Sequence, residues 1–286
     1  MKKYGAFTSF FVSRFDFIVR FFYCKLRLFR LVNRLMPRVY SSDFHSLDGY
    51  FGIIRRQMES HGFSIKGKSV LEIGPGNSFI NAYNFLHAGA RSVTLIDKYP
   101  RHCDSVAQRS YVRSEIDFFK VRWSVDRFEY VDNTTCMPDP KYIRFIAGDL
   151  ADVDFGERVD FIYSIAVLHH IRDLPRYIRK MSDILASGGM LFHVIDLKDK
   201  FHFFGNPFLF YKYSDFTWDL LLTEDSITYT NRVRYGEYID LFTSNGFELV
   251  WKVVREYEVP DIRLAPRFSG RDDLHIGDAQ LLFRKK

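Results

Sequence analysis

Apolar runs of strand length alternate with helix-like segments between residues 68 and 195 of this 286-residue chain. The runs predict strands over 68–74, 92–97, 142–147, 159–165 and 190–195. Helices are predicted over 47–61, 79–88 and 173–186, followed by a closing helix over 235–244 and strands over 248–254 and 280–283. Strands that alternate with helices form a parallel sheet covered on both faces. The pattern therefore predicts an α/β fold with a doubly wound, Rossmann-like, mainly parallel sheet of seven strands.

The turn after the first strand, Val70-Leu-Glu-Ile-Gly-Pro-Gly-Asn-Ser-Phe79, joins a strand to a helix. Glycines at such a turn let the backbone approach a ligand, and the helix N-terminus offers N–H groups. A dinucleotide site needs another glycine where Phe79 stands. Glu72, two residues before Gly74, suits a cationic ligand better than a pyrophosphate. The ammonium and sulfonium of S-adenosylmethionine meet that condition. Alternatively, Glu72 is a partner of the helix N-terminus.

Two acidic residues end the next strands and fit the same cofactor. Asp97 ends the second strand, 21 residues after Gly76, at the distance of a carboxylate that accepts both ribose hydroxyls. Asp149 and Leu150 follow the third strand. We expect Asp149 to accept from the adenine amino group while Leu150 packs on the ring. Asp149 as a plain turn residue is the alternative.

The motifs occur in a fixed order across residues 68–197. They are Val70–Ser78, Leu95–Asp97, Gly148–Leu150, Asp160–His170 and Leu185–Gly189. In this order they resemble the class I S-adenosylmethionine-dependent methyltransferase family, although many members carry a third glycine where Ser78 stands. The resemblance implies an antiparallel last strand and S-adenosylmethionine as cofactor. It implies a cofactor site formed by Glu72, Gly74, Gly76, Asp97, Asp149, Leu150 and Ser164.

Methyl transfer to a hydroxyl also needs a base, and candidates follow the fourth and fifth strands. We expect the catalytic residues to be His170, Asp196 and Asp199. A structural hydrogen bond for His170 and loop capping for the two aspartates are the alternatives. His169 is a neighbouring candidate, and His193, inside an apolar strand, is expected to be a core residue.

The segment 201–234 lies between the fifth strand and the closing helix and is rich in aromatic residues. An insertion at this place covers the cleft of such a fold, so we interpret it as a helical, aromatic lid over the methyl acceptor. Asn231, Arg232 and Arg234 are predicted to bind the substrate through hydroxyls, a carboxylate or a phosphate. A plain aromatic mini-core is the alternative.

Residues 1–40 hold nine basic residues and one acidic residue, so this segment carries +8 and the rest of the chain −2. Such a distribution argues against nucleic acid as a partner. Phenylalanine is frequent in the same segment, and Pro37 is expected to end a basic amphipathic helix. A basic amphipathic helix with large aromatic residues predicts peripheral contact with an anionic membrane. The alternative is a helix that packs on the core or on a second subunit, so a homo-oligomer stays open.

The three cysteines are scattered and form no C-x-x-C pair, which favours a reduced, cytoplasmic protein and no cysteine metal site. No ligand spacing indicates a metal. We expect an N-terminal helical extension over 1–45 and a methyltransferase domain over 46–286. Within this domain, the cofactor core is 68–200, the lid 201–234 and the closing part 235–286.

The Gly-Pro-Gly-Asn-Ser form of the turn, together with Asp196, Asp199 and residues 230–232 downstream, resembles a bacterial subgroup associated with surface-polysaccharide synthesis. The resemblance implies O-methylation of a sugar hydroxyl in a polysaccharide or glycan precursor. Two alternatives stay open. One is a methyltransferase for a quinone or lipid at the inner face of the membrane, and the other is a non-catalytic S-adenosylmethionine-binding protein.

Overall fold

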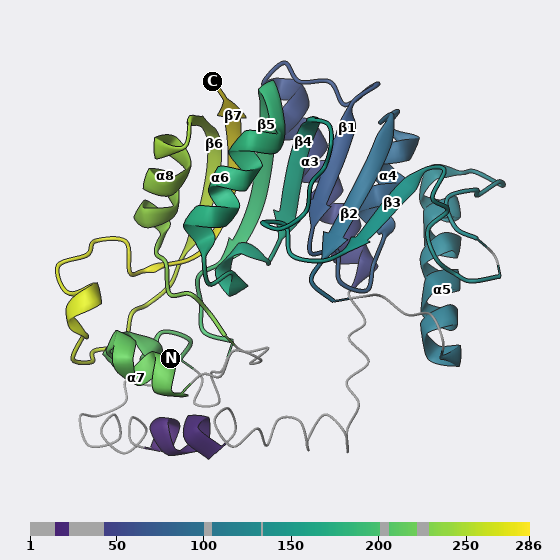
Figure 1. Cartoon of the computed structure of the whole chain (residues 1–286). Coiled ribbons are helices and arrows are strands. Elements are labelled where there is room, and N and C mark those ends of the chain that lie inside the picture. The colour runs from purple at the N-terminus through teal and green to yellow at the C-terminus, as the bar shows by residue number, and fades with distance from the viewer. Residues whose placement is uncertain (1–14, 23–42, 100–104, 133, 201–205, 222–228) are drawn as a thin grey trace.

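A seven-stranded sheet forms the centre of the molecule (Figure 1). The computed structural model describes residues 15–22, 43–99, 105–132, 134–200, 206–221 and 229–286. The remainder of the basic extension, and Pro37 with it, lies outside the described residues. The strands are β1 (Ser69–Ile73), β2 (Ser92–Asp97), β3 (Ile143–Ala147), β4 (Val159–Ile165), β5 (Leu185–Asp196), β6 (Phe247–Glu256) and β7 (Ile276–Lys285).

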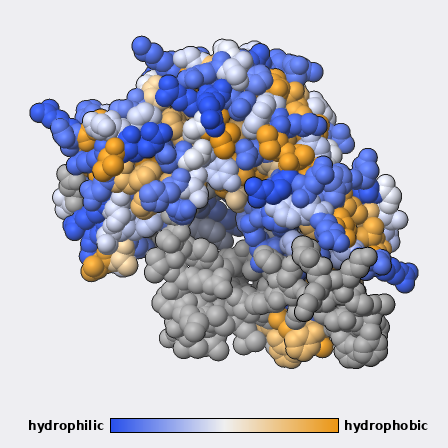
Figure 2. Space-filling model, turned by 180° about the vertical axis from the view of Figure 1, so that it is seen from behind, coloured by the Kyte–Doolittle hydropathy of each residue, from blue (hydrophilic) through white to orange (hydrophobic). Residues whose placement is uncertain are grey.

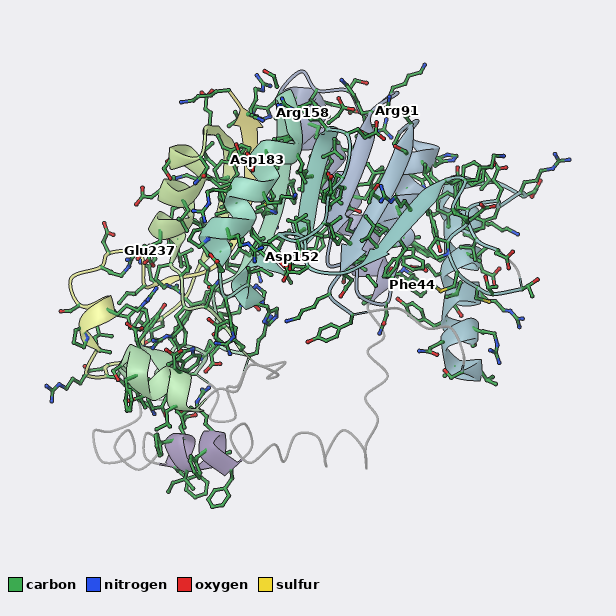
Figure 3. All side chains as sticks on the ribbon, viewed as in Figure 1. Phe44, Arg91, Asp152, Arg158, Asp183 and Glu237 are labelled. Atoms are coloured by element: carbon green, nitrogen blue, oxygen red, sulfur yellow. The ribbon has the colours of Figure 1, made fainter. Side chains whose placement is uncertain are left out.

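The strand order is β3-β2-β1-β4-β5-β7-β6, with parallel pairs from β3 to β5 and antiparallel pairs on both sides of β7. This confirms the predicted mainly parallel sheet with an antiparallel last strand. Arg91 and Arg158, which directly precede β2 and β4, lie at the upper edge of the sheet in Figure 3. The carboxyl ends of the parallel strands therefore meet at the lower edge.

Helices cover both faces of the sheet because successive side chains of each strand point to opposite faces. Val70 packs in the core with α3 (Phe44–Ser60), α4 (Ile80–His87) and α5 (Val106–Trp123). Leu71 and Ile73 pack in the core of the opposite face, with α6 (Leu174–Ile184) and α8 (Tyr235–Ser244). All five residues of β1 are buried, as expected for a central parallel strand.

Strand β5 begins earlier than its sequence pattern predicts. The chain enters the strand directly from α6, at Leu185, although the sequence predicts a helix to residue 186 and a strand from Met190. Gly189 makes this path feasible, because a Cβ atom there would lie 2.8 Å from the Asp160 carbonyl oxygen.

Helix α5 lies inside the segment 101–140, for which the sequence predicts no element. Ser105 caps it in a capping box with Gln108, and Ser124 ends it at a left-handed φ of 52°. Its buried residues are Val112, Glu115 and Phe119. So narrow an apolar stripe among charged residues gives a weak helical pattern.

The described lid residues form a third, smaller core. It joins the short helices η3 (Leu209–Lys212), α7 (Asp215–Leu221) and η4 (Pro266–Phe268). Its buried aromatic residues are Phe208, Phe210, Tyr211, Tyr213, Trp218 and Phe268. These rings pack on one another, which agrees with the mini-core alternative. Within the part of the chain that the structure describes, no helix is long and apolar enough to cross a bilayer.

Candidate functional site

The ends of β1, β2 and β3 lie side by side at the lower edge of the sheet. The Gly74 amide donates to the Ile96 carbonyl and the Gly148 amide to the Asp97 carbonyl, both at 2.8 Å. The predicted cofactor positions on these three strands are therefore brought together. Open α/β sheets bind their ligands at this edge.

Two residues of the glycine turn have a backbone conformation that glycine adopts more easily than any other residue. Gly74 has a φ of +70° and Gly76 a φ of +61°. A Cβ atom on Gly74 would lie 2.5 Å from a methyl group of Val167, so the turn packs closely against the loop after β4. The Gly76 amide donates to the Asp97 carboxylate at 3.3 Å, and the Tyr99 amide donates to its other oxygen at 3.0 Å.

Glu72 is buried at the end of β1, 5 % exposed, and accepts a 2.6 Å hydrogen bond from the Tyr163 hydroxyl of β4. Burial raises the pKa of Glu72 to about 8, against the effect of that hydrogen bond. The charges of Glu115 and Asp97, both negative, raise the pKa further. A cation bound nearby would lower the pKa of Glu72 and favour its ionised form.

Glu115 of α5 is a site residue that the sequence analysis missed. One of its carboxylate oxygens accepts from the Phe79 and Ile80 amides, each at 2.9 Å, and from the Ser78 hydroxyl. The N-terminus of α4 is thus capped by a carboxylate from a distant helix. A pyrophosphate would need those same amides, so this cap argues against a dinucleotide there. The contact is not local in sequence, and no motif marks it.

Asp97 and Glu115 give the glycine turn a negative environment, and Glu72 adds a further negative charge when a cation nearby favours its ionised form. This charge fits a cofactor that carries an ammonium and a sulfonium, and it opposes an anionic one. Glu72, Gly74, Gly76 and Asp97 therefore fit the predicted cofactor as a group.

Three further predicted cofactor residues lie beside this group. Asp149 accepts from the Ala151 amide at 3.0 Å, as a turn residue does, and Leu150 is buried. The Ser164 hydroxyl is buried and bonds to Nδ1 of His193 at 2.8 Å. Their cofactor roles stay predictions. Burial lowers the pKa of His193 to about 3, consistent with a neutral core histidine.

Two adjacent histidines occupy η2 (Leu168–His170), directly after β4. Nδ1 of His170 lies 2.6 Å from the Tyr229 carbonyl oxygen and must donate to it, which leaves Nε2 as the proton-accepting atom. Burial lowers the pKa of His170, although that hydrogen bond acts in the opposite direction. His169 is buried, and neither of its ring nitrogens bonds to any described residue. The ring centroids of the two histidines are 4.0 Å apart.

The two predicted catalytic aspartates are held in ion pairs. Burial alone would raise the pKa of Asp196, but Lys200 at 2.6 Å and Lys198 at 3.0 Å lower it to about 2. Asp199 is buried and pairs with Arg20. A carboxylate with so low a pKa is a weak proton acceptor, and a buried ion pair points to a structural role. Their catalytic roles stay predictions that this geometry does not favour.

The three predicted substrate-binding residues hold the lid in place. Asn231 donates to the Leu168 and Ile171 carbonyls, each at 2.9 Å. Arg232 donates to the Tyr213 carbonyl at 2.7 Å and pairs with Asp215 of α7. Arg234 is buried and bonds to the carbonyls of residues 197 and 276. These contacts occupy much of their hydrogen-bonding capacity, and substrate binding by them stays a prediction.

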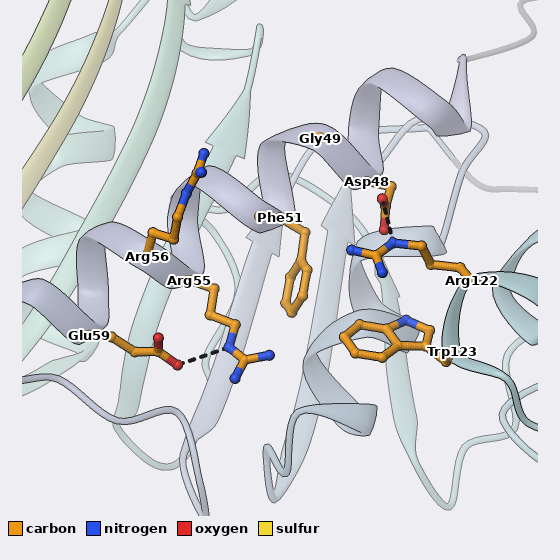
Figure 4. Close-up of a pocket in the computed structure, with 9 residues that line it drawn as sticks. Asp48, Gly49, Phe51, Arg55, Arg56, Glu59, Arg122 and Trp123 are labelled. Carbon is orange, nitrogen blue, oxygen red and sulfur yellow. Dashed lines mark hydrogen bonds and ion pairs between the residues drawn. The ribbon is translucent and has the colours of Figure 1, made fainter.

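A hollow of about 400 Å³ lies elsewhere, between α3 and the end of α5 (Figure 4). Arg55 pairs with Glu59 at 2.8 Å, and Arg122 pairs with Asp48 at 3.1 Å. Trp123 at its rim is fixed by a 2.7 Å hydrogen bond to Asn84. None of the predicted cofactor or catalytic residues lines this hollow, so we do not include it in the site.

Comparison with known proteins gives one family. A family profile described as a methyltransferase domain matches residues 48–251. No curated protein matches the chain. The fold is similar to that of a proposed sarcosine dimethylglycine methyltransferase from Galdieria sulphuraria, with a TM-score of 0.50 and 13 % identity over 83 % of this chain and 85 % of that one.

Two further solved structures share the similarity. N-methyltransferase NodS from Bradyrhizobium japonicum WM9, in complex with S-adenosylhomocysteine, has 17 % identity and a TM-score of 0.44, over 83 % of this chain and 86 % of that one. A 1,6-didemethyltoxoflavin N1-methyltransferase from Burkholderia thailandensis has 14 % identity and a TM-score of 0.47, over 91 % and 87 %.

Proposed function

Because the chain belongs to the methyltransferase domain family, we propose that it methylates a hydroxyl group of a sugar in a polysaccharide or glycan precursor. Its cofactor is S-adenosylmethionine, which supplies an activated methyl group on a sulfonium. Glu72, Gly74, Gly76 and Asp97 would hold it, with Asp149, Leu150 and Ser164 bordering it. The buried Glu72 carboxylate, raised in pKa and surrounded by negative charge, supports the cationic cofactor.

The observation that carries a hydroxyl acceptor is the His170 imidazole. Its Nδ1 proton is committed to the Tyr229 carbonyl, and its lowered pKa keeps the ring neutral at physiological pH. Nε2 is then ready to take the proton that a hydroxyl loses on methylation, as a general base does. An amine acceptor that is already neutral needs no such base during the transfer.

His169 is the second residue that we expect to contact the methyl acceptor. A buried imidazole that lacks a partner among the described residues costs free energy unless a ligand supplies one. Asp196, ionised and clamped by two lysines, would act as a fixed charge near the histidines, and Asp199 would act through the segment that follows β5.

The test is methyl transfer from labelled cofactor to a panel of sugar precursors, for wild type and for His170→Ala. We expect labelled sugar and a loss of about 10²–10⁴-fold in kcat for the variant. The variant's rate should climb with pH across the whole range, whereas the wild-type rate levels off once His170 is neutral. The matched control is His275→Ala, which removes a half-buried imidazole that lies 3.6 Å from Glu256. Label found in protein or RNA and in no sugar would contradict the proposal.

A second candidate is a quinone or lipid acceptor at the cytoplasmic face of a membrane. The observation in its favour is the exposure of large apolar side chains at the N-terminal segment, among them Phe15 at 58 %. A third candidate, a protein that binds the cofactor without transfer, predicts ligand binding and no turnover with any member of the panel. We propose the domain limits 1–45 and 46–286 as the working division, with the lid over 201–234.

A further inference from the structure

The helical segment 15–22 has the reverse of the usual polarity. Its charged residues point inward, with Asp16 at 0 % and Arg20 at 1 % exposure. Three of its large apolar residues point outward, with Phe15 58 %, Ile18 47 % and Phe22 49 % exposed, whereas Val19 and Phe21 pack on the lid core. The spacing of these three residues places them on one side of a helix. A solvated helix would expose the charges and bury the rings.

The inward face is held by a cluster of charges that joins the segment to Asp199 and to Lys212 of the lid. Arg20 donates to Asp16 at 3.0 Å and pairs with Asp199. Asp16 also accepts from the Tyr213 hydroxyl at 2.7 Å and lies 3.3 Å from the Lys212 ammonium. Two acids and two bases compensate one another in this cluster. Rolling the segment to bury its phenylalanines would separate these buried pairs, so the cluster fixes the outward direction of the rings.

The exposed face lies on the functional side of the molecule. Figure 1 shows the segment in purple below α7, on the same side as the carboxyl ends of the parallel strands. Figure 2 shows apolar atoms in orange at this base of the molecule. We define the apolar platform as the outward residues of the segment, which are Phe15, Phe17, Ile18 and Phe22.

Charge identifies what would cover the platform. The platform lies within the 40 residues that carry nine basic residues against one acidic residue. A symmetric contact with a second copy would bring two strongly basic stretches of sequence together, which like-charge repulsion opposes. An anionic bilayer attracts lysine and arginine and accepts aromatic and aliphatic side chains between its headgroups.

We propose that the apolar platform docks this protein on an anionic lipid surface, with the Asp16–Arg20–Asp199 cluster holding its rings toward the bilayer. The edge of the sheet that carries the cofactor site then faces the membrane side. This inference goes beyond the proposed function and does not need methyl transfer to occur. Lipid binding and turnover can therefore fail separately.

The test is co-sedimentation of the full chain with vesicles of phosphatidylcholine alone or mixed with phosphatidylglycerol. The triple variant Phe15→Ser, Ile18→Ser, Phe22→Ser removes apolar platform residues and keeps every charge. The control, Val106→Ser with Val121→Ser, removes two apolar side chains that are 76 % and 81 % exposed on α5. Thermal unfolding and circular dichroism check that each variant is folded.

We expect wild type and control to bind the anionic vesicles at low salt and to leave neutral ones largely unbound. The triple variant should lose at least about ten-fold in partition coefficient, since three large side chains no longer enter the bilayer. Equal binding by wild type and triple variant would mean that charge alone attracts the protein and would overturn the platform. The platform would also be overturned if wild type failed to bind the anionic vesicles, or if wild type formed a dimer in solution that the triple variant did not form.

Discussion

Glu72 shows how a single buried residue sets the character of the cofactor edge. Its carboxyl group accepts a hydrogen bond from the Tyr163 hydroxyl, and burial together with the negative charges of Glu115 and Asp97 raises its pKa to about 8. The folded chain therefore favours the protonated form at neutral pH. A cationic ligand would favour the ionised form, so binding and proton release are linked at this residue.

Glu72→Gln tests this electrostatic picture through stability. In the folded chain the pKa of Glu72 is about 8, above the ordinary value of 4.5. Glu72 therefore contributes most to the unfolding free energy below pH 4.5, and this contribution is lost as the pH rises from 4.5 to 8. The unfolding free energy of wild type, minus that of Glu72→Gln, should fall by about 1.4 kcal/mol per pH unit within this window. Chemical denaturation of the unliganded proteins measures the difference. If the unfolding free energies of the two proteins changed in parallel with pH, Glu72 would have an ordinary pKa in the folded state.

At the scale of elements, α5 stabilises the start of α4 through one side chain. Glu115→Ala should cost about 2–4 kcal/mol of unfolding free energy, because it removes from a buried site the carboxylate that both the Phe79 and the Ile80 amide bond at 2.9 Å. Asp117→Ala, an exposed change two residues further along the same helix, should be close to neutral. Urea unfolding compares the two. If both variants were equally stable, the prediction that Glu115 stabilises the N-terminus of α4 would be wrong.

The elements themselves were predictable where a local pattern specifies them. β2 and β4 have the predicted bounds, since unbroken apolar runs define buried parallel strands. α5 was missed because its apolar stripe is narrow. The partners of Asp199 and Arg234 could not be predicted either, since Arg20 and the residue 276 carbonyl lie 179 and 42 positions away. A sequence pattern places a residue at a strand end, but long-range packing decides whether that residue meets a ligand or another side chain.

At the scale of the whole molecule, the lower edge of the sheet gathers the cofactor turn, the histidine pair, the lid and the apolar platform on one side (Figure 1). The glycine turn contributes negative charge to this side, whereas the first 40 residues are strongly basic. This separation suits a protein that binds a small cationic cofactor in its interior and an anionic surface at its periphery.

Ligand binding should therefore stabilise the whole chain selectively. At about 100 times its dissociation constant, S-adenosylmethionine or S-adenosylhomocysteine should add about 2.7 kcal/mol to the unfolding free energy, and NAD should add nothing. NAD fails because the carboxylate of Glu115 already occupies the Phe79 and Ile80 amides that its pyrophosphate would need.

Asp97→Asn should shrink the stabilisation, since it removes the charge that is expected to hold the ribose while an amide oxygen can still accept from the Gly76 amide. Asp183→Asn, an exposed change on α6, is the matched control. Thermal unfolding with each ligand measures the shift. If S-adenosylmethionine stabilised Asp97→Asn as much as wild type, the ribose would have to bind another carboxylate of this edge. If NAD stabilised wild type, the proposal of a cationic cofactor would be contradicted.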